Sequence, residues 1–436
     1  MKISAIAGLI SVLLLLGFTT RTTPPTDKKA IQQDLPYLVA FYKDRHMHPE
    51  ISLQEKETSK TLAGELRKIG VEVTENFGGF GIVGVIKNGS GPTILYRTDM
   101  DALPMYEKTD LPYKSILTAR SNGEEVGTMH SCGHDIHMTT WLGTARAMMK
   151  MKDKWKGTLL LIGQPAEEIG AGSKMMLDNG LYEKFGVPDF GIGLHSSPTI
   201  KAGQVGLGKG YTMANTESID IRVFGVGAHG ASPHMSIDPV VIASMMVMEL
   251  QTIVSRNVPP LESAVVTVGA IKGGTVNNII PDEVILKLTV RTFTQEVRSL
   301  VHKRIKEIAK GVAIAAGLPV EKMPEVNIPS VYTPANYNHP ALVDRLTSSA
   351  VSVLGQENVL KSDPLTIGED FSRYGQTREQ VPCVLFWLGT VTEEKIQSGN
   401  LPSLHSPFYY PVPDKSIETG ITVMTQSLLD LFNTKI

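Results

Sequence analysis

The feature that most constrains the fold of this chain is a series of short, continuous apolar runs separated by stretches of helical periodicity. The runs are GIVGVI (81–86), TILYR (93–97), TLLLIG (158–163), FGIGLH (190–195) and CVLFWLG (383–389). Strands buried on both faces of a sheet have this continuous pattern, because helices cover the sheet from either side. Helical periodicity occurs between the runs, over 53–69 and about 137–151. The sequence therefore predicts an α/β fold in which helices flank a mostly parallel sheet.

The segment 213–326 breaks this rhythm. Its apolar residues alternate with polar ones, and its predicted elements follow the order strand, helix, strand, strand, helix, strand. This order is typical of a ferredoxin-like α+β unit with one face of its sheet buried. A chain of 436 residues also exceeds the ~250–300 residues at which one core usually stops growing. We therefore expect one domain made of residues 27–212 and 327–436, with a second domain inserted into it at 213–326.

The first 26 residues resemble a leader rather than part of a domain. Lys2 precedes an apolar run from Ile3 to Phe18, and a polar, proline-containing stretch follows. The run is shorter than the ~20 apolar residues that a membrane span needs, which favours a signal peptide. No clear small-residue cleavage site follows it, so an uncleaved N-terminal anchor is the alternative. We expect an exported protein, periplasmic or at the cell surface.

The charge balance argues against nucleic acid as a partner. The chain has 42 Lys and Arg against 44 Asp and Glu, with a formal net charge of -2 and no long run of one sign. A nucleic-acid surface needs a basic patch or stripe. A small-molecule partner is the better expectation.

Polar side chains follow three of the predicted strands. TILYR runs into Asp99 and Asp101, TLLLIG runs into Glu167 and Glu168, and FGIGL ends at His195. The carboxyl ends of parallel strands meet at one edge of a sheet, where ligands bind in open α/β folds. These side chains are therefore expected to lie together.

A cysteine and a histidine close to one another add a second signal. Cys132 and His134 lie in a loop that precedes a predicted helix, and Cys383 is the only other cysteine. One disulfide between the two cysteines is the alternative, but thiolate, imidazole and carboxylate together are ligands for a zinc-like ion. We therefore predict that Cys132 is a metal ligand. Asp99, Asp101 or Asp135 could orient a metal-bound imidazole.

Two neighbouring carboxylates allow two roles at such a site. One of Glu167 and Glu168 can bind metal while the other takes a proton from water and passes it to a leaving group. Each feature alone has an ordinary structural explanation, such as a solvated loop. Their conjunction predicts metal-dependent hydrolysis.

Seven motifs carry a resemblance to a known family. In chain order they are RTDMDALP (97–104), MHSCGHDIH (129–137), QPAEE (164–168), GAHGASPH (227–234), NNIIPD (277–282), GEDF (368–371) and HSP (405–407). Together they resemble the amidohydrolase branch of the aminoacylase/carboxypeptidase metallopeptidase superfamily, which includes hippurate hydrolases, N-acetyl-amino-acid deacetylases and indole-acetyl-amino-acid hydrolases. The resemblance implies a zinc-exopeptidase-like fold in which residues 27–212 and 327–436 form the catalytic domain. The inserted segment 213–326 would be a lid domain that forms a homodimer contact.

The resemblance also implies roles for individual residues at a site with two divalent ions, which could be zinc, manganese, cobalt or nickel. Glu167 would be the general base, and Asp101 would orient a metal-bound histidine. Cys132 would bridge the two ions. The remaining protein ligands would be His134, Glu168, His195 and His405.

The resemblance implies a catalytic role for His229 and substrate-binding roles for two further residues of the inserted segment. His229 would stabilise the oxyanion, sometimes across a dimer. Asn277 and Arg291 would hold a substrate carboxylate, which suits a guanidinium. The alternatives are that Asn277 only shapes a turn and Arg291 only caps a strand. His46, in the RHMHPE motif, is expected to be structural.

The sequence thus predicts a metal-dependent amidohydrolase that cleaves an N-acyl amino acid to a carboxylic acid and a free amino acid. An exported dipeptidase or carboxypeptidase is the alternative within the same chemistry. A catalytically silent binding protein is the alternative outside it.

Overall fold

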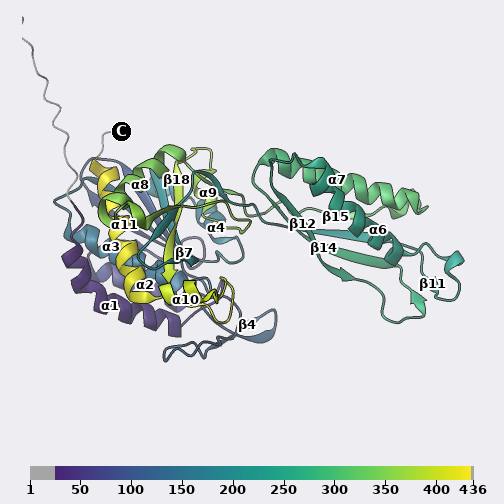
Figure 1. Cartoon of the computed structure of the whole chain (residues 1–436), viewed down its shortest axis with the longest axis horizontal. Helices are drawn as coiled ribbons and strands as arrows, with labels where there is room; N and C mark the ends of the chain where they lie inside the picture. The colour runs from purple at the N-terminus through teal and green to yellow at the C-terminus, as the bar shows by residue number, and fades with distance from the viewer. Residues whose placement is uncertain (1–24, 434–436) are drawn as a thin grey trace, which may run out of the picture.

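The computed structural model describes residues 25–433 as two bodies, a larger one around a wide sheet and a smaller one containing α6 and α7 (Figure 1). Almost all of the predicted leader, residues 1–26, lies outside the described residues.

The larger body is built on an eight-stranded sheet of order β1-β2-β6-β3-β7-β18-β8-β17. Its four central strands, β6, β3, β7 and β18, are parallel to one another. The prediction of a mostly parallel sheet is confirmed, although β2 pairs antiparallel with β6. The strands are β1 (Glu72–Thr74), β2 (Ile82–Asn88), β6 (Gly157–Gln164), β3 (Thr93–Asp99), β7 (Phe190–Lys201), β18 (Cys383–Val391), β8 (Val205–Leu207) and β17 (Val359–Lys361).

Strand β18 illustrates why the predicted runs are continuously apolar. Val384 and Phe386 pack into the core on one face of the sheet, and Leu385 and Trp387 pack into a second core on the other face. Successive side chains of a strand point to opposite faces, so a strand covered on both faces needs no polar positions.

Helices supply the cover on both faces. One face packs against α1 (Lys28–Met47), α2 (Lys56–Lys68), α3 (His134–Lys150), α8 (Pro340–Leu354) and α11 (Pro413–Asn433). The other packs against the short helices α4 (Gly172–Asp178), α5 (Leu181–Phe185) and α9 (Ser372–Gly375).

The smaller body has a four-stranded antiparallel sheet of order β12-β14-β10-β15, and its elements follow the ferredoxin-like order. Buried and partly buried residues alternate along β14, because α6 and α7 pack on one face of this sheet. The elements are β10 (Glu217–Phe224), α6 (Pro239–Thr252), β12 (Ala264–Lys272), β14 (Glu283–Thr292), α7 (Gln295–Ala315) and β15 (Glu325–Asn327).

Two chain segments that run side by side connect the bodies. The backbone N–H of Thr216 donates to the carbonyl of Thr333 at 2.8 Å, and the reverse bond measures 3.2 Å. Next to them, β9 (Gly210–Met213) pairs with β16 (Asn336–Asn338). The smaller body therefore leaves and re-enters the larger one at a single place, and residues 210–216 and 332–338 are called the connecting segments below.

Candidate functional site

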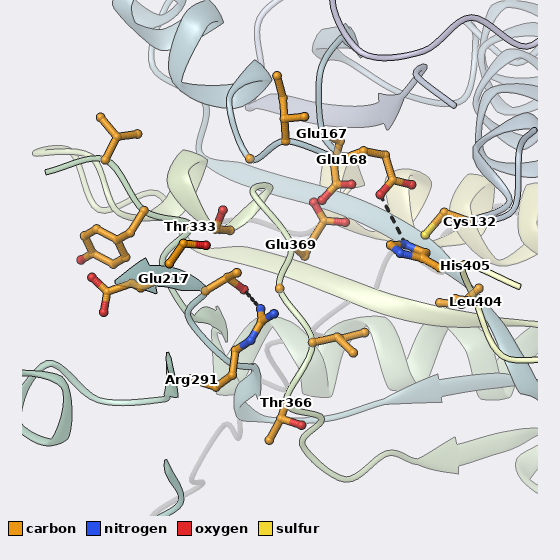
Figure 2. Close-up of a pocket in the computed structure, with 18 of the residues that line it drawn as sticks. Cys132, Glu167, Glu168, Glu217, Arg291, Thr333, Thr366, Glu369, Leu404 and His405 are labelled. Atoms are coloured by element: carbon orange, nitrogen blue, oxygen red, sulfur yellow. Dashed lines mark hydrogen bonds and ion pairs between the residues drawn. The ribbon is translucent and has the colours of Figure 1, made fainter. Parts of the chain in front are cut away.

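A cleft of about 710 Å³ lies where the larger body meets the connecting segments (Figure 2). Its walls combine the loop after β6, His195 within β7, the loop before α3, the loop around residues 366–369 and the base of the smaller body. The predicted site residues among its lining are Cys132, Glu167, Glu168, His195, Arg291 and His405.

Cys132 and His195 form the first pair of candidate ligands. The Cys132 Sγ lies 3.5 Å from the His195 Nε2, while the His195 Nδ1 donates to the carbonyl of Ser196 at 2.9 Å. The loop can approach β7 this closely because Gly133 has φ +77 and no side chain; a Cβ there would lie 2.5 Å from the Ser196 Oγ. Both cysteines of the chain are free thiols.

His134 and Glu168 present buried ligand atoms that lack hydrogen-bond partners within residues 25–433. The His134 Nδ1 donates to the main-chain carbonyl of Asp101 at 2.7 Å, which leaves its Nε2 facing the Glu168 Oε1 at 3.7 Å. Both of these atoms are buried and unpaired. Buried polar atoms are normally satisfied, and a divalent cation between them would satisfy both. The donor set therefore fits a metal ion.

Cys132 belongs to two groups of possible ligands. Its Sγ and ring nitrogens of His134 and His195 all lie within 4.8 Å of one another, and the same is true of Cys132, Glu168 and His405. The His405 Nε2 lies 3.3 Å from the Glu168 Oε2 (Figure 2). The structure therefore brings all five predicted ligands together, with the thiol shared between the groups.

Asp101 contacts the His134 ring directly. Its main-chain carbonyl accepts from the His134 Nδ1 at 2.7 Å, and its Oδ1 lies 3.6 Å from the same nitrogen. The carboxylate accepts the backbone N–H groups of Glu167 and Glu168, each at 3.0 Å, and the Ser52 hydroxyl at 2.6 Å. Asp101 therefore holds the loop that carries the two glutamates.

His137, the third histidine of the MHSCGHDIH motif, has both ring nitrogens occupied. Its Nδ1 donates to the Asp99 Oδ1 at 2.7 Å, and its Nε2 accepts the Ser196 N–H at 2.7 Å. Neither nitrogen is free to bind metal, so His137 and Asp99 support the loops around the ligands.

A buried charge network behind Glu167 escaped the sequence reasoning. The Arg97 guanidinium donates to Asp99 at 2.8 Å, to Glu369 at 2.9 Å and to Asp370 at 3.2 Å. Glu167, Glu369 and Asp370 in turn place carboxylate oxygens within 4.8 Å of one another. The sequence did contain a sign of this network. Glu369 and Asp370 belong to the GEDF motif, which contributed to the resemblance although no role was assigned to them.

The surroundings of the two glutamates favour their protonated forms. Burial, then the charges of Glu369 and Glu168, raise the pKa of Glu167 well above its usual value. Burial also raises the pKa of Glu168, to about 8, and raises that of the Cys132 thiol. Cations at the cluster would favour the ionised ligands instead. A carboxyl group that holds its proton near neutral pH suits general acid-base chemistry.

The predicted catalytic His229 and the two predicted substrate-binding residues of the smaller body are split between two places. Arg291, in β14, lines the cleft, donates to the Thr216 Oγ1 and has no ion-pair partner within residues 25–433. His229 lies in the short strand β11 (Ala228–His229), which pairs with β13 (Ile279–Ile280) just after Asn277. This ribbon is at the tip of the smaller body, away from the larger one, so neither residue lines the cleft (Figure 1).

Comparison with known proteins agrees with the geometry of the site. A match to Peptidase family M20/M25/M40 covers residues 95–430. The chain is 37% identical to the N-acetyl-L-cysteine deacetylase of Bacillus subtilis, over 81% of this chain and 80% of the relative. It is also 37% identical to the N-acetyldiaminopimelate deacetylase of Lactococcus lactis, over 84% of this chain and 93% of the relative.

A solved structure of similar fold is that of YxeP from Bacillus subtilis, a dinuclear metal-binding peptidase of the M20 family. It has a TM-score of 0.76 and 28% sequence identity, and covers 93% of this chain and 100% of that one. The resemblance noted in the sequence is thereby confirmed. The chain belongs to Peptidase family M20/M25/M40 and is an amidohydrolase, an enzyme that hydrolyses amide bonds.

Proposed function

We propose that this protein hydrolyses N-acyl amino acids to a carboxylic acid and a free amino acid. The observation that carries the proposal is the pair of ligand groups sharing Cys132. They are set in a cleft whose opposite wall presents the guanidinium of Arg291, which has no carboxylate partner within residues 25–433 (Figure 2). The deacetylases to which the chain is similar act on N-acetylated amino acids by their names, which supports this substrate class.

Two divalent ions suit the donor set. Zinc, manganese, cobalt and nickel all accept mixed thiolate, imidazole and carboxylate ligands. When bound, such ions act as Lewis acids that polarise a carbonyl and acidify water. Cys132 would be shared between the ions, and the other ligands would be His134, Glu168, His195 and His405.

We propose that Glu167 moves the proton. Its carboxylate is buried beside Glu168 and next to the Arg97 network, and Asp101 fixes its backbone. Glu167 would take a proton from the attacking water and give it to the leaving nitrogen, which makes that nitrogen a neutral amine. Arg97 holds the carboxylates of Glu369 and Asp370 in place behind it, through contacts of 2.9 Å and 3.2 Å.

Arg291 would hold the carboxylate of the amino-acid part. Its guanidinium is about half buried at the cleft and lacks a carboxylate partner within the described residues. A guanidinium in this state gains charge-assisted hydrogen bonds when a carboxylate arrives.

We propose a homodimer formed through the smaller body. Its helix α6 exposes Val241, Met245 and Met248, at 54%, 45% and 71%, and β12 is an edge strand of the sheet. By length and composition, the segment Pro239–Asn257 could cross a membrane, but in the fold it packs on the antiparallel sheet. A second copy would cover this apolar face and edge. It would also bring His229 from the tip of one protomer toward the cleft of its partner.

We also propose export of the chain, directed by the apolar run Ile3–Phe18. Cell fractionation of a tagged full-length chain tests this: cytoplasmic recovery of an unprocessed protein contradicts it.

The substrate proposal is tested by release of free amino acid from N-acetyl, N-benzoyl and indole-acetyl amino acids and from dipeptides with free amino termini. Metal-loaded and chelated protein are compared. We expect metal-dependent cleavage of the blocked substrates in preference to dipeptides. Preference for dipeptides would favour a peptidase. No release of amino acid from any substrate, with metal bound, would favour a binding protein.

A further inference from the structure

Glu217 lines the cleft, but its carboxylate is already bound by Arg298 and His302. It is the first residue of β10, and its side chain is fully buried. Its two carboxylate oxygens accept bonds from the Arg298 Nη2 at 2.5 Å and the His302 Nε2 at 2.8 Å. The Arg298 guanidinium in turn lies 3.7 Å from the ring centre of Tyr332, on a connecting segment. A substrate ammonium group would have to break this network to reach Glu217.

The other carboxylates of the cleft also have partners, either in the ligand cluster or in Arg97. Glu167 and Glu168 belong to the ligand cluster, and Glu369 is paired with Arg97 at 2.9 Å and accepts the Phe371 N–H at 2.9 Å. Among the residues that line the cleft, none therefore offers a carboxylate to a positive charge on a substrate side chain.

Positive charge in the cleft is also limited. His195 and His405 face the ligand cluster, which leaves Arg291 as the one guanidinium or ammonium group among the lining residues. A substrate with a single carboxylate matches this arrangement. A second carboxylate on the substrate would have to lose its water without gaining a cationic partner, which is unfavourable.

The remaining lining contains apolar side chains together with uncharged hydroxyl groups, those of Thr216, Ser218, Tyr332, Thr333 and Thr366. Ile169, Val331 and Ile367 line the cleft and are 56%, 53% and 37% exposed, and Leu404 lies beside His405. These side chains would bury apolar area against an apolar substrate group, which favours binding of that group. A charged group in the same place would be desolvated without a partner.

We propose that this cleft selects N-acyl amino acids with one carboxylate and an uncharged, apolar side chain, and disfavours those with a distal ammonium, carboxylate or amino-acid group. The inference rests on the proposed function and narrows it. It separates two substrates that the relatives' names leave side by side, a small neutral amino acid and diaminopimelate.

The test measures kcat/KM of the metal-loaded enzyme for a matched set of acetylated amino acids. The neutral members are N-acetyl-methionine and N-acetyl-leucine; the charged ones are Nα-acetyl-lysine, N-acetyl-glutamate and N-acetyl-diaminopimelate. We expect the neutral members to be favoured by at least about tenfold. Titration calorimetry of the Glu167→Gln protein with the same compounds gives their affinities without turnover and should rank them alike.

A charge introduced into the wall provides the second arm. Val331→Asp adds a carboxylate beside the substrate side chain, and Val331→Asn adds the same volume without charge. We expect the ratio of kcat/KM for Nα-acetyl-lysine over N-acetyl-methionine to rise at least about fivefold in Val331→Asp relative to Val331→Asn. Thermal unfolding of both variants checks that they remain folded.

The outcomes separate the two proposals. Equal or preferred cleavage of the charged substrates overturns the selectivity and leaves the amidohydrolase reaction intact. An unchanged ratio between the two Val331 variants also counts against it, because it removes Val331 from the side-chain wall. Silence of the metal-loaded enzyme with every acylated amino acid overturns the proposed function and the selectivity together.

Discussion

At the scale of single residues, the site depends on side chains that are held by their neighbours rather than by solvent. Arg97 is 1% exposed and bonded to three carboxylates, and the carboxylate of Asp101 is tied to two backbone N–H groups. Buried charges of this kind stay ionised only while their partners remain, so the network fixes one geometry. Asp101 in turn fixes the backbone of Glu167 and Glu168, so the network also sets the positions of these two residues.

The role of Glu167 leads to the first prediction. Glu167→Gln keeps the size of the side chain but removes its ability to exchange a proton. We expect kcat to fall by about 10²–10⁴-fold, while metal content measured by elemental analysis stays the same. Glu125→Gln is the matched control, at an exposed position of the hairpin formed by β4 (Thr118–Ser121) and β5 (Glu124–Gly127). Near-normal turnover by Glu167→Gln would remove this residue from proton transfer.

His46 leads to a prediction about pH. Burial opposes its charged form, but hydrogen bonds to Asp135 at 2.6 Å and Glu107 at 3.2 Å outweigh burial and raise its pKa from 6.5 to about 9. A raised pKa contributes stability that is complete below pH ~6.5 and is lost as the pH rises toward 9. Relative to His46→Gln, we expect the wild type to lose on the order of 3 kcal/mol of its advantage across that range.

Urea unfolding at several pH values, at constant metal load, measures this loss. His48→Gln is the control, because the His48 ring is 54% exposed and such surface changes usually alter stability by less than ~0.5 kcal/mol. A wild-type advantage that stays constant or grows between pH 6.5 and 9 contradicts the charged pairing of His46.

At the scale of elements, the connecting segments touch the loops that carry the catalytic side chains. Gly170, two residues after Glu168, has φ +64 and lies against the Thr333 Oγ1, so a Cβ there would clash. Gly368, just before Glu369, lies in the same way against the Thr216 Oγ1. A movement of the smaller body about its connections would therefore reach both loops directly.

Gly170→Ala tests this coupling. The added methyl group must push Thr333 and the loop of Glu168 apart, and we expect kcat/KM to fall at least about tenfold, since small misplacements of catalytic groups are costly. Gly123→Ala is the matched control, because Gly123 also has a positive φ, +85, but no atom within 4 Å of the added Cβ. An equal, small effect of both changes would mean that backbone strain alone matters and that the contact does not transmit motion.

Strand positions could be predicted from the sequence because burial on two faces leaves a continuous apolar run, as in β18. The antiparallel direction of β2 could not be predicted, because the composition of a strand does not indicate which strand it pairs with or in which direction. Helix α3 begins at His134 rather than near His137, because its first turn is polar and packs into the site. The Arg97–Glu369 pair spans 272 residues, and no local spacing signals such a contact.

At the scale of the whole molecule, the cleft is open toward the smaller body, but His229 of that body does not line it. Arg291 reaches the cleft from the base of the smaller body, while His229 lies at its tip (Figure 1). Family motifs in a sequence cannot say which protomer a side chain serves. In the proposed dimer, one protomer would supply the metal ligands and its partner the His229 imidazole.

Mixing two inactive variants distinguishes the arrangements. A Glu167→Gln protomer paired with a His229→Asn protomer has one site with both native groups only if His229 acts in the partner's cleft. An equal mixture, unfolded and refolded together, should then recover up to about a quarter of wild-type activity. If the mixture stays as inactive as its components while forming mixed dimers, His229 does not act across the interface.

The place of the smaller body in the chain also sets an order of events during synthesis. Strand β7 finds its central neighbour β18 only after the ribosome has made the whole inserted body, whereas β10 to β15 form a continuous stretch that needs nothing downstream. We expect nascent chains that end before Cys383 to protect residues 217–327 from protease and to leave residues 93–201 cleavable; early protection of 93–201 would contradict this. The half-made sheet exposes β7 as an unpaired edge throughout that interval, so the window for misassembly of this enzyme is set by the length of its own insertion.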